Sequence, residues 1–108
     1  MQFKIISASE LISRLPLEET LMIDLRSKAD YDIGHIPEAI WADWETLETN
    51  IENLLGSVKH PIKQIVLYCD YGNISLLTAR DLARIGYPVI TVNGGYNAYL
   101  QNKASSNK

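Results

Sequence analysis

Cysteine is the scarcest reactive residue in this chain, with Cys69 alone among 108 residues. A single cysteine cannot form an internal disulfide. The two histidines, His35 and His60, have no spacing to Cys69 that is typical of metal ligands. The sequence therefore excludes a disulfide framework, and we expect neither a metal nor a cofactor.

Long hydrophobic runs and excess positive charge are also missing. No apolar run approaches the ~20 residues of a membrane-spanning helix, and residues 1–7 lack the charged-then-apolar pattern of a secretory signal. Ten Lys and Arg against thirteen Asp and Glu give a net charge of −3. This balance argues against nucleic-acid and anionic-membrane partners. We expect a cytoplasmic protein whose partners are small molecules or other proteins.

The length allows one hydrophobic core and leaves no room for a second domain, with 46% of the residues hydrophobic. Residues 102–108 are polar and have nothing to bury, so we expect a disordered tail there. The predicted domain therefore comprises residues 1–101.

Strand and helix patterns alternate along this domain. Short apolar runs predict strands at residues 3–6, 21–25, 39–41, 65–68 and 89–92. Helices are expected at residues 8–15, 28–31, 44–55, 76–85 and 96–101, the first four capped by Ser7, Ser27, Asp43 and Ser75. Such alternation predicts an α/β fold in which a central parallel β-sheet is flanked by helices on both faces.

Two of these helices have informative faces. The helix at 76–85 should bury an apolar face made of Leu76, Leu77, Ala79, Leu82 and Ala83. The helix at 44–55 carries Glu45, Glu48 and Glu52 at intervals of three and four. This acidic face is either a solvated surface or a docking patch for a basic partner.

The stretch 65–75 places Cys69 in the turn between a buried strand and a helix. Such a turn directs unpaired backbone N–H groups, and the positive end of the helix dipole, into one small concavity. A free cysteine titrates near pH ~8.5 and a helix N-terminus lowers this value, so we expect Cys69 to be largely a nucleophilic thiolate at neutral pH. The alternative is a buried, inert cysteine.

Four segments together resemble one known family. The stretch from Tyr68 to Ser75 (YCDYGNIS) is similar to the active-site loop of rhodanese-like sulfurtransferases, which commonly runs Y-C-x-x-G-x-R-S. The Asp24-Leu25-Arg26 stretch matches the D-x-R of this family, residues 31–39 (YDIGHIPEA) match its F/Y-x-x-G-H-I-x-G-A segment, and Gly94-Gly95 matches its late G-G.

The resemblance implies a single rhodanese-like domain that transfers sulfur through its cysteine. Cys69 would accept a sulfane sulfur, hold it as a persulfide and pass it to a thiophilic acceptor. The donor would be a small sulfur compound or a protein persulfide, and the acceptor a thiol or a cyanide-like nucleophile. The loop that would bind the persulfide comprises Asp70, Tyr71, Gly72, Asn73, Ile74 and Ser75.

Backbone reasoning assigns supporting roles around this loop. Gly72 suits a bend with positive φ, and we expect a side chain there to intrude on the pocket. Asp24 ends a buried strand and needs a partner, for which Arg26 and loop N–H groups are candidates. We interpret Asp24 and Arg26 as residues that fix the loop rather than catalyse. His35 is interpreted as structural rather than as a general base.

Three positions depart from the family pattern. Ile74 stands where the loop usually has Arg, and Asp70 is often a basic position. Glu38 replaces a Gly, for which we expect a different turn geometry or a shifted loop. A loop without a cation disfavours a dianionic donor such as thiosulfate, because one charge-assisted contact contributes ~1.5–3 kcal/mol. A less charged persulfide donor fits better.

The sequence leaves three functions open. The first is a sulfurtransferase or persulfide carrier that uses Cys69. The second is a non-catalytic rhodanese-fold binding or regulatory module, which the missing loop Arg and the acidic helix face favour. The third is a phosphatase or arsenate reductase, whose Cys-loop-Arg site lacks its Arg here, at Ile74.

Overall fold

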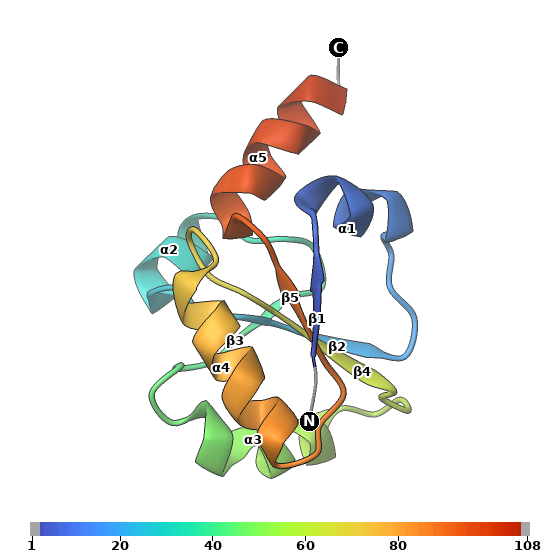
Figure 1. The fold of residues 1–108 in the computed structure, drawn as a ribbon, viewed down its shortest axis with the longest axis vertical. Helices are drawn as coiled ribbons and strands as arrows, with labels where there is room; N and C mark the ends of the chain where they lie inside the picture. The colour runs from blue at the N-terminus through green and yellow to red at the C-terminus, as the bar shows by residue number, and fades with distance from the viewer. Residues whose placement is uncertain (1–2, 107–108) are drawn as a thin grey trace.

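The computed structural model describes residues 3–106, which form one parallel sheet covered by helices (Figure 1). Its strands are β1 (Lys4–Ile6), β2 (Thr20–Asp24), β3 (Ile40–Trp41), β4 (Gln64–Tyr68) and β5 (Val89–Val92). Its helices are α1 (Ala8–Arg14), α2 (Lys28–Ile33), α3 (Leu47–Ser57), α4 (Asn73–Arg84) and α5 (Gly95–Ser106). All strand pairs are parallel, in the order β1-β5-β4-β2-β3. The predicted fold class is confirmed.

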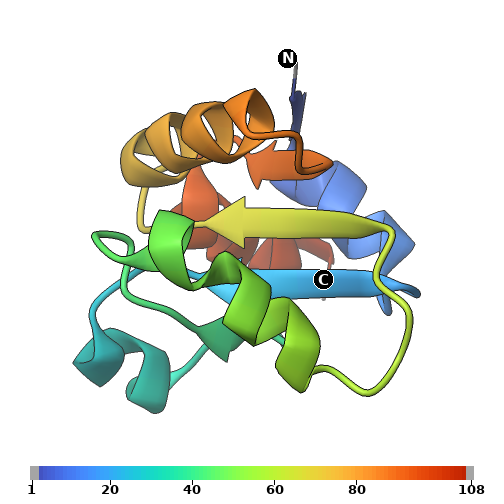
Figure 2. The same ribbon diagram turned by 90° about the horizontal axis from the view of Figure 1, so that it is seen from below.

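Alternating side chains of the central strands divide the core into two halves. Ile65 and Leu67 of β4 point to one face, where they pack with residues of α3 and α4. Val66 and Tyr68 point to the other face, where they pack with residues of α1 and α5. Figure 2 shows the same two layers of helices on opposite sides of the sheet. This period of two fixes on which face each functional side chain can lie.

Two predicted helix caps are present. The Ser7 hydroxyl accepts a hydrogen bond from the backbone N of Glu10 at 3.0 Å, and α1 ends before Pro16. The Ser27 hydroxyl accepts one from the backbone N of Asp30 at 3.2 Å and starts α2. None of the helices within residues 3–106 is long and apolar enough to cross a membrane.

The third helix begins later than predicted. Asp43 accepts a hydrogen bond from the backbone N of Glu45 at 3.0 Å, but it does so in a separate turn. The helix α3 starts only after Thr46 and runs through Gly56, which the sequence had suggested as its stop. Asp43 therefore caps a turn that precedes the helix.

The fourth helix begins earlier than predicted, and it buries a different face. Gly72 is its N-cap residue, with φ 100°, so Ser75 lies in the first turn and is fully buried. Leu76 and Leu77, expected in the core, are 39% and 53% exposed. The buried face consists of Ser75, Thr78, Ala79, Leu82 and Ala83. Two hydroxyl residues on this face obscured its periodicity in the sequence.

The last helix also differs from the expectation. The tail predicted to be disordered from residue 102 is helical as far as Ser106, and residues 107–108 lie outside the described residues. The Asn102 side chain donates to the carbonyl of Ala98 at 2.8 Å, and the Lys103 ammonium lies over the Tyr99 ring. These contacts one turn apart extend the helix beyond its buried part.

The turn at Glu38 has a backbone conformation that is unusual for a residue with a side chain. Glu38 adopts φ 75° and is exposed. This left-handed conformation is one that glycine adopts freely and other residues adopt rarely. Whether the turn differs from that of relatives with glycine stays a prediction.

Candidate active site

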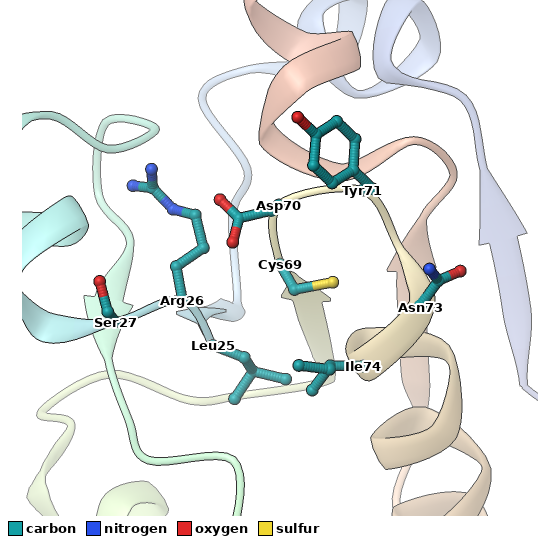
Figure 3. Close-up of a pocket in the computed structure, with 8 residues that line it drawn as sticks. All are labelled: Leu25, Arg26, Ser27, Cys69, Asp70, Tyr71, Asn73 and Ile74. Atoms are coloured by element: carbon teal, nitrogen blue, oxygen red, sulfur yellow. The ribbon is translucent and has the colours of Figure 1, made fainter.

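Two loops meet at the carboxyl edge of the sheet. Strands β2 and β4 are neighbours, with Asp24 paired to Tyr68 in the register, and the backbone N of Leu25 donates to the carbonyl of Tyr68 at 2.8 Å. Cys69 follows directly on β4, and Arg26 follows on β2 (Figure 3). This is the edge at which open parallel sheets bind their ligands.

The sulfur of Cys69 lies among hydrogen-bond donors. The backbone N of Gly72 donates to Sγ at 3.1 Å, and the backbone N of Ser75 donates to it at 3.4 Å. The Ser75 hydroxyl lies 3.6 Å from Sγ. Cys69 itself is only 4% exposed. Both backbone groups belong to the start of α4, so the sulfur occupies the position where a helix N-terminus stabilises negative charge.

Gly72 makes this bend possible through the positive φ that the sequence predicted, but a side chain there would meet different neighbours from those expected. Its φ of 100° is unfavourable for other residues. A Cβ at this position would lie 3.1 Å from the backbone N of Gly94 and 3.4 Å from the carbonyl O of Val92. A side chain at Gly72 would therefore meet the β5–α5 turn. The expectation that it would intrude on the pocket is wrong.

The start of α5 holds the outer side of the cysteine loop. The backbone N of Tyr96 donates to the carbonyl of Cys69 at 2.8 Å, and that of Asn97 donates to the carbonyl of Asp70 at 3.1 Å. Gly95 makes this approach possible, because a Cβ there would overlap the carbonyl oxygen of Cys69 and lie 2.7 Å from that of Asp70. These two hydrogen bonds restrain the start of the loop, while the N–H groups of Gly72 and Ser75, farther along it, face the sulfur.

A cavity of about 230 Å³ opens beside Cys69 (Figure 3). It is lined by Leu25, Arg26, Ser27, Cys69, Asp70, Tyr71, Asn73 and Ile74. Ile74 is partly buried and packs against the core, whereas Tyr71 is 67% exposed at the rim. Asp70, also exposed, adds a carboxylate. The space next to the sulfur is thus apolar on one side and acidic on the other.

Asp24 and Arg26 form a buried pair next to this cavity. Nη2 of Arg26 lies 2.8 Å from Oδ2 of Asp24, and Nε lies 3.1 Å from both carboxylate oxygens. Burial disfavours the guanidinium charge, but hydrogen bonding and attraction to Asp24 outweigh it and raise the pKa of Arg26. The guanidinium carbon Cζ of Arg26 lies over the Tyr96 ring, 3.9 Å from the ring centroid. Arg26 is therefore the partner of Asp24 that the sequence suggested.

His35 packs within the connector after α2 and does not line the cavity beside Cys69. The ring of His35 stacks on Tyr31 with centroids 4.0 Å apart, and its Nδ1 lies 2.9 Å from the carbonyl O of Ile36. The Tyr68 hydroxyl accepts a hydrogen bond from the backbone N of Ile36 at 3.1 Å. Burial, and then the charge of Asp24, raise the pKa of Tyr68. These contacts hold the connector against the sheet.

The structure brings the predicted loop together and adds residues that sequence reasoning missed, among them Thr91. Gly72 and Ser75 contact the sulfur, while Asp70, Tyr71, Asn73 and Ile74 line its cavity. Thr91 of β5 donates from Oγ1 to the Ser75 hydroxyl at 2.9 Å. Its only signal was a polar residue in the apolar run VITV. Within residues 3–106, no group of His, Cys, Asp and Glu side chains could hold a metal ion.

A parallel sheet that presents a cysteine at a helix N-terminus on its carboxyl edge defines a class of α/β domain built around a nucleophilic or anion-binding loop. Within this class, the family model of the rhodanese-like domain matches residues 7–102. The chain therefore belongs to the rhodanese-like domain family.

Two curated relatives are similar over most of the chain. It is 34% identical over 91 residues to the tRNA sulfurtransferase of Desulfurococcus amylolyticus, covering 84% of this chain and 17% of the relative. It is 31% identical over 83 residues to the adenylyltransferase and sulfurtransferase UBA4 of Candida albicans, covering 73% of this chain and 19% of the relative. The matched part thus spans less than a fifth of either relative.

Solved structures with lower identity share the fold. The human single-domain sulfurtransferase TSTD1 superposes with a TM-score of 0.75 at 24% identity, covering 93% of this chain and 97% of its own. A protein of unknown function from Rhodopseudomonas palustris, described as a possible tyrosine phosphatase, gives a TM-score of 0.78 at 20% identity, covering 94% and 82% of the two chains. At these identities the likeness concerns architecture alone.

Proposed function

We propose that this protein is a sulfurtransferase or persulfide carrier in which Cys69 holds the transferred sulfur. The observation that carries the proposal is the pair of backbone N–H groups, from Gly72 and Ser75, that donate to Sγ at 3.1 and 3.4 Å beside an open cavity. Donors fixed in this way stabilise a sulfur anion without having to reorganise. The sulfurtransferase names of both curated relatives support the same chemistry.

The transfer consists of two displacements on sulfur. The Cys69 thiolate attacks the outer sulfur of a persulfide donor, a new S–S bond forms, and the electron pair of the donor's S–S bond leaves with the donor thiolate. An external thiolate or cyanide then attacks the outer sulfur of Cys69, and the bonding pair returns to Sγ. Because the chain has no second cysteine, turnover depends on an external acceptor.

The lining of the cavity favours a donor of low negative charge. Ile74 offers no cation where a charged fork would face the substrate, and Asp70 adds a carboxylate. Arg26 also lines the cavity, but its charge is balanced by Asp24 and its guanidinium points away from the sulfur (Figure 3). A persulfide of a small thiol or of a protein fits this lining better than thiosulfate does.

A non-catalytic binding or regulatory module is the second candidate. The missing loop cation favours it, as does the exposed acidic surface of α3 at Glu48 and Glu52. A phosphatase or arsenate reductase is less compatible with the site, because Ile74 occupies the place of the Arg that would bind an oxyanion.

The deciding experiment is intact mass after incubation with a persulfide donor. We expect the parent protein to gain one sulfur, and to lose it to cyanide or a small thiol. Cys69→Ser should gain none while keeping the same circular dichroism spectrum. A parent protein that gains no sulfur from any persulfide, although its thiol is alkylated, would support the binding module instead. Sulfur transfer by Cys69→Ser at the parent rate would refute the assignment of the residue.

A further inference from the structure

Thr91 is a buried polar residue in a strand that otherwise presents only apolar side chains. It is 2% exposed and lies in the middle of β5, paired in register with Leu67 on one side and Ile5 on the other. Its hydroxyl donates to Ser75 on the first turn of α4. A hydroxyl placed there must have a partner, because an unpaired one costs about 1–3 kcal/mol.

The hydroxyl of Ser75 has more acceptors within reach than it can use. It receives a hydrogen bond from Thr91 at 2.9 Å, and it lies 3.3 Å from the carbonyl O of Gly72 and 3.6 Å from Sγ of Cys69. A serine hydroxyl has one proton to donate. With Thr91 occupying a lone pair, that proton can point to the Gly72 carbonyl or to the sulfur.

We propose that Thr91 is a positioning residue for the Cys69 site, acting through Ser75. The proposal rests on the proposed function and deepens it. Thr91 supplies the first donor of a chain that runs from Thr91 to Ser75 to the sulfur, and it keeps the Ser75 proton available to whichever acceptor is the more negative. In this chain each hydrogen bond polarises the next.

The chain responds to the charge on sulfur. When Cys69 is a thiol, its S–H donates to the Ser75 oxygen and the Ser75 proton points to the carbonyl of Gly72. When the thiol proton leaves to solvent, the Ser75 hydroxyl rotates and donates to the thiolate. Thr91 keeps donating to Ser75 in both states. The sulfur anion thereby gains a third donor, a side chain, beside the two backbone groups.

A purely structural role predicts something different. If Thr91 only satisfied the buried oxygen of Ser75, its loss would lower stability without changing how Cys69 responds to pH. Thr78 provides a matched control, because it is a buried threonine on the same face of α4 whose hydroxyl donates to the carbonyl of Ile74 at 2.9 Å and not to Ser75.

The test is the pH profile of Cys69 alkylation by a neutral reagent, measured in Thr91→Val, Thr91→Ser, Thr78→Val, Ser75→Ala and the double variant of Thr91→Val with Ser75→Ala. We expect Thr91→Val to lower the rate near neutral pH by roughly three- to tenfold and to move the midpoint of the profile upward. Thr91→Ser should restore the parent profile. Thr78→Val should leave it unchanged, and Thr91→Val should have no further effect once Ser75 is Ala.

The outcomes separate this inference from the proposed function. If the parent protein accepts sulfur and Thr91→Val has the parent alkylation profile, Thr91 does not position the site and the inference is wrong. The same conclusion follows if Thr91→Val and Ser75→Ala act additively. If the parent protein accepts no sulfur, the proposed function fails, yet the profile of Thr91→Val still decides whether the hydroxyl chain reaches Cys69.

Discussion

The two loops at the carboxyl edge of the sheet use polar groups in opposite ways. After β2, the charges of Asp24 and Arg26 are matched to each other by side-chain contacts, the shortest of 2.8 Å, and both residues are buried. After β4, no side-chain cation is present, and the backbone N–H groups of Gly72 and Ser75 point at a single sulfur. The charges in the loop after β2 are therefore neutralised within the loop, whereas the loop after β4 has hydrogen-bond donors directed at a site where a negative charge could form.

The loop that we propose to be reactive is therefore not the one with the larger charges. A buried ion pair whose hydrogen bonds are all satisfied stabilises the loop conformation, and it has no free donor or acceptor with which to bind a ligand. Under the proposed function, the backbone donors held by Gly72 and by the start of α5 stabilise the negative charge that forms on the sulfur. Four substitutions can break or sharpen this comparison.

The largest effect is expected from Asp24→Asn, which leaves the buried guanidinium of Arg26 without its counter-charge. We expect the free energy of unfolding to fall by about 3–5 kcal/mol, as measured by urea denaturation. Adding Arg26→Met should restore part of the loss, because no unpaired charge then remains. In the folded fraction, Cys69 should be alkylated within about twofold of the parent rate. A much larger loss of reactivity would mean that the two loops are not separate.

Gly95→Ala should disturb the cysteine loop itself. The added Cβ would overlap the carbonyl oxygen of Cys69, and φ is 59° at this position. We expect a loss of about 2–4 kcal/mol in stability together with slower alkylation of Cys69. Gly86→Ala is the matched control, since φ is 102° there and nothing lies within 4 Å of the added Cβ. It should lose only about 1 kcal/mol, with unchanged alkylation. Equal effects of the two variants would contradict the contact with the loop.

Ile74→Arg tests whether the loop lacks only charge. A cation beside the cavity should raise thiosulfate sulfurtransferase kcat/KM by roughly ten- to hundredfold, because it adds ~1.5–3 kcal/mol of stabilisation to an anionic transition state. Asp70→Arg should act in the same direction. Activity toward a persulfide donor should change much less, and Ile74→Met serves as the uncharged control of similar length. If the folded Arg variants show no activity with either thiosulfate or the persulfide donor, the binding module becomes the better explanation.

The smallest effect is expected at Glu38, which is exposed and lines neither the cavity nor the cysteine loop. Its φ of 75° is one that glycine adopts freely, so Glu38→Gly should relieve strain while adding flexibility to the unfolded chain. We expect a net stabilisation of at most about 1 kcal/mol, and no change in Cys69 alkylation. Destabilisation by more than that amount would show that the Glu38 side chain makes a contribution which the backbone conformation does not explain.

The sequence was sufficient for the sheet and for the sulfur position. Buried apolar runs, helix caps such as Ser7 and polar strand ends such as Asp24 depend on neighbouring residues in the sequence. They can therefore be recognised from a single segment of the chain. The cysteine loop was readable for the same reason, because a strand, a turn with Gly72 and a helix follow one another without interruption.

What the sequence could not give depends on segments that meet only in three dimensions. Ser75 was read as a cap, but the conformation of Gly72 starts the helix earlier and turns Ser75 toward Cys69 and Thr91. The exposure of Leu77 followed from the same shift of the helix face. The part played by Gly95 was hidden as well, since nothing near it in sequence reveals that the Cys69 carbonyl lies against it.

The contact between α5 and the cysteine loop has a consequence for when the thiol becomes competent during synthesis. During synthesis, β4, Cys69 and α4 leave the ribosome before residues 94–97 do. The nascent chain therefore contains Cys69 before it contains the N–H groups that bind the carbonyls of Cys69 and Asp70. Until Tyr96 and Asn97 dock, the loop carbonyls have no such restraint. The order of elements along the chain thus delays assembly of the thiol site until the end of the domain has emerged.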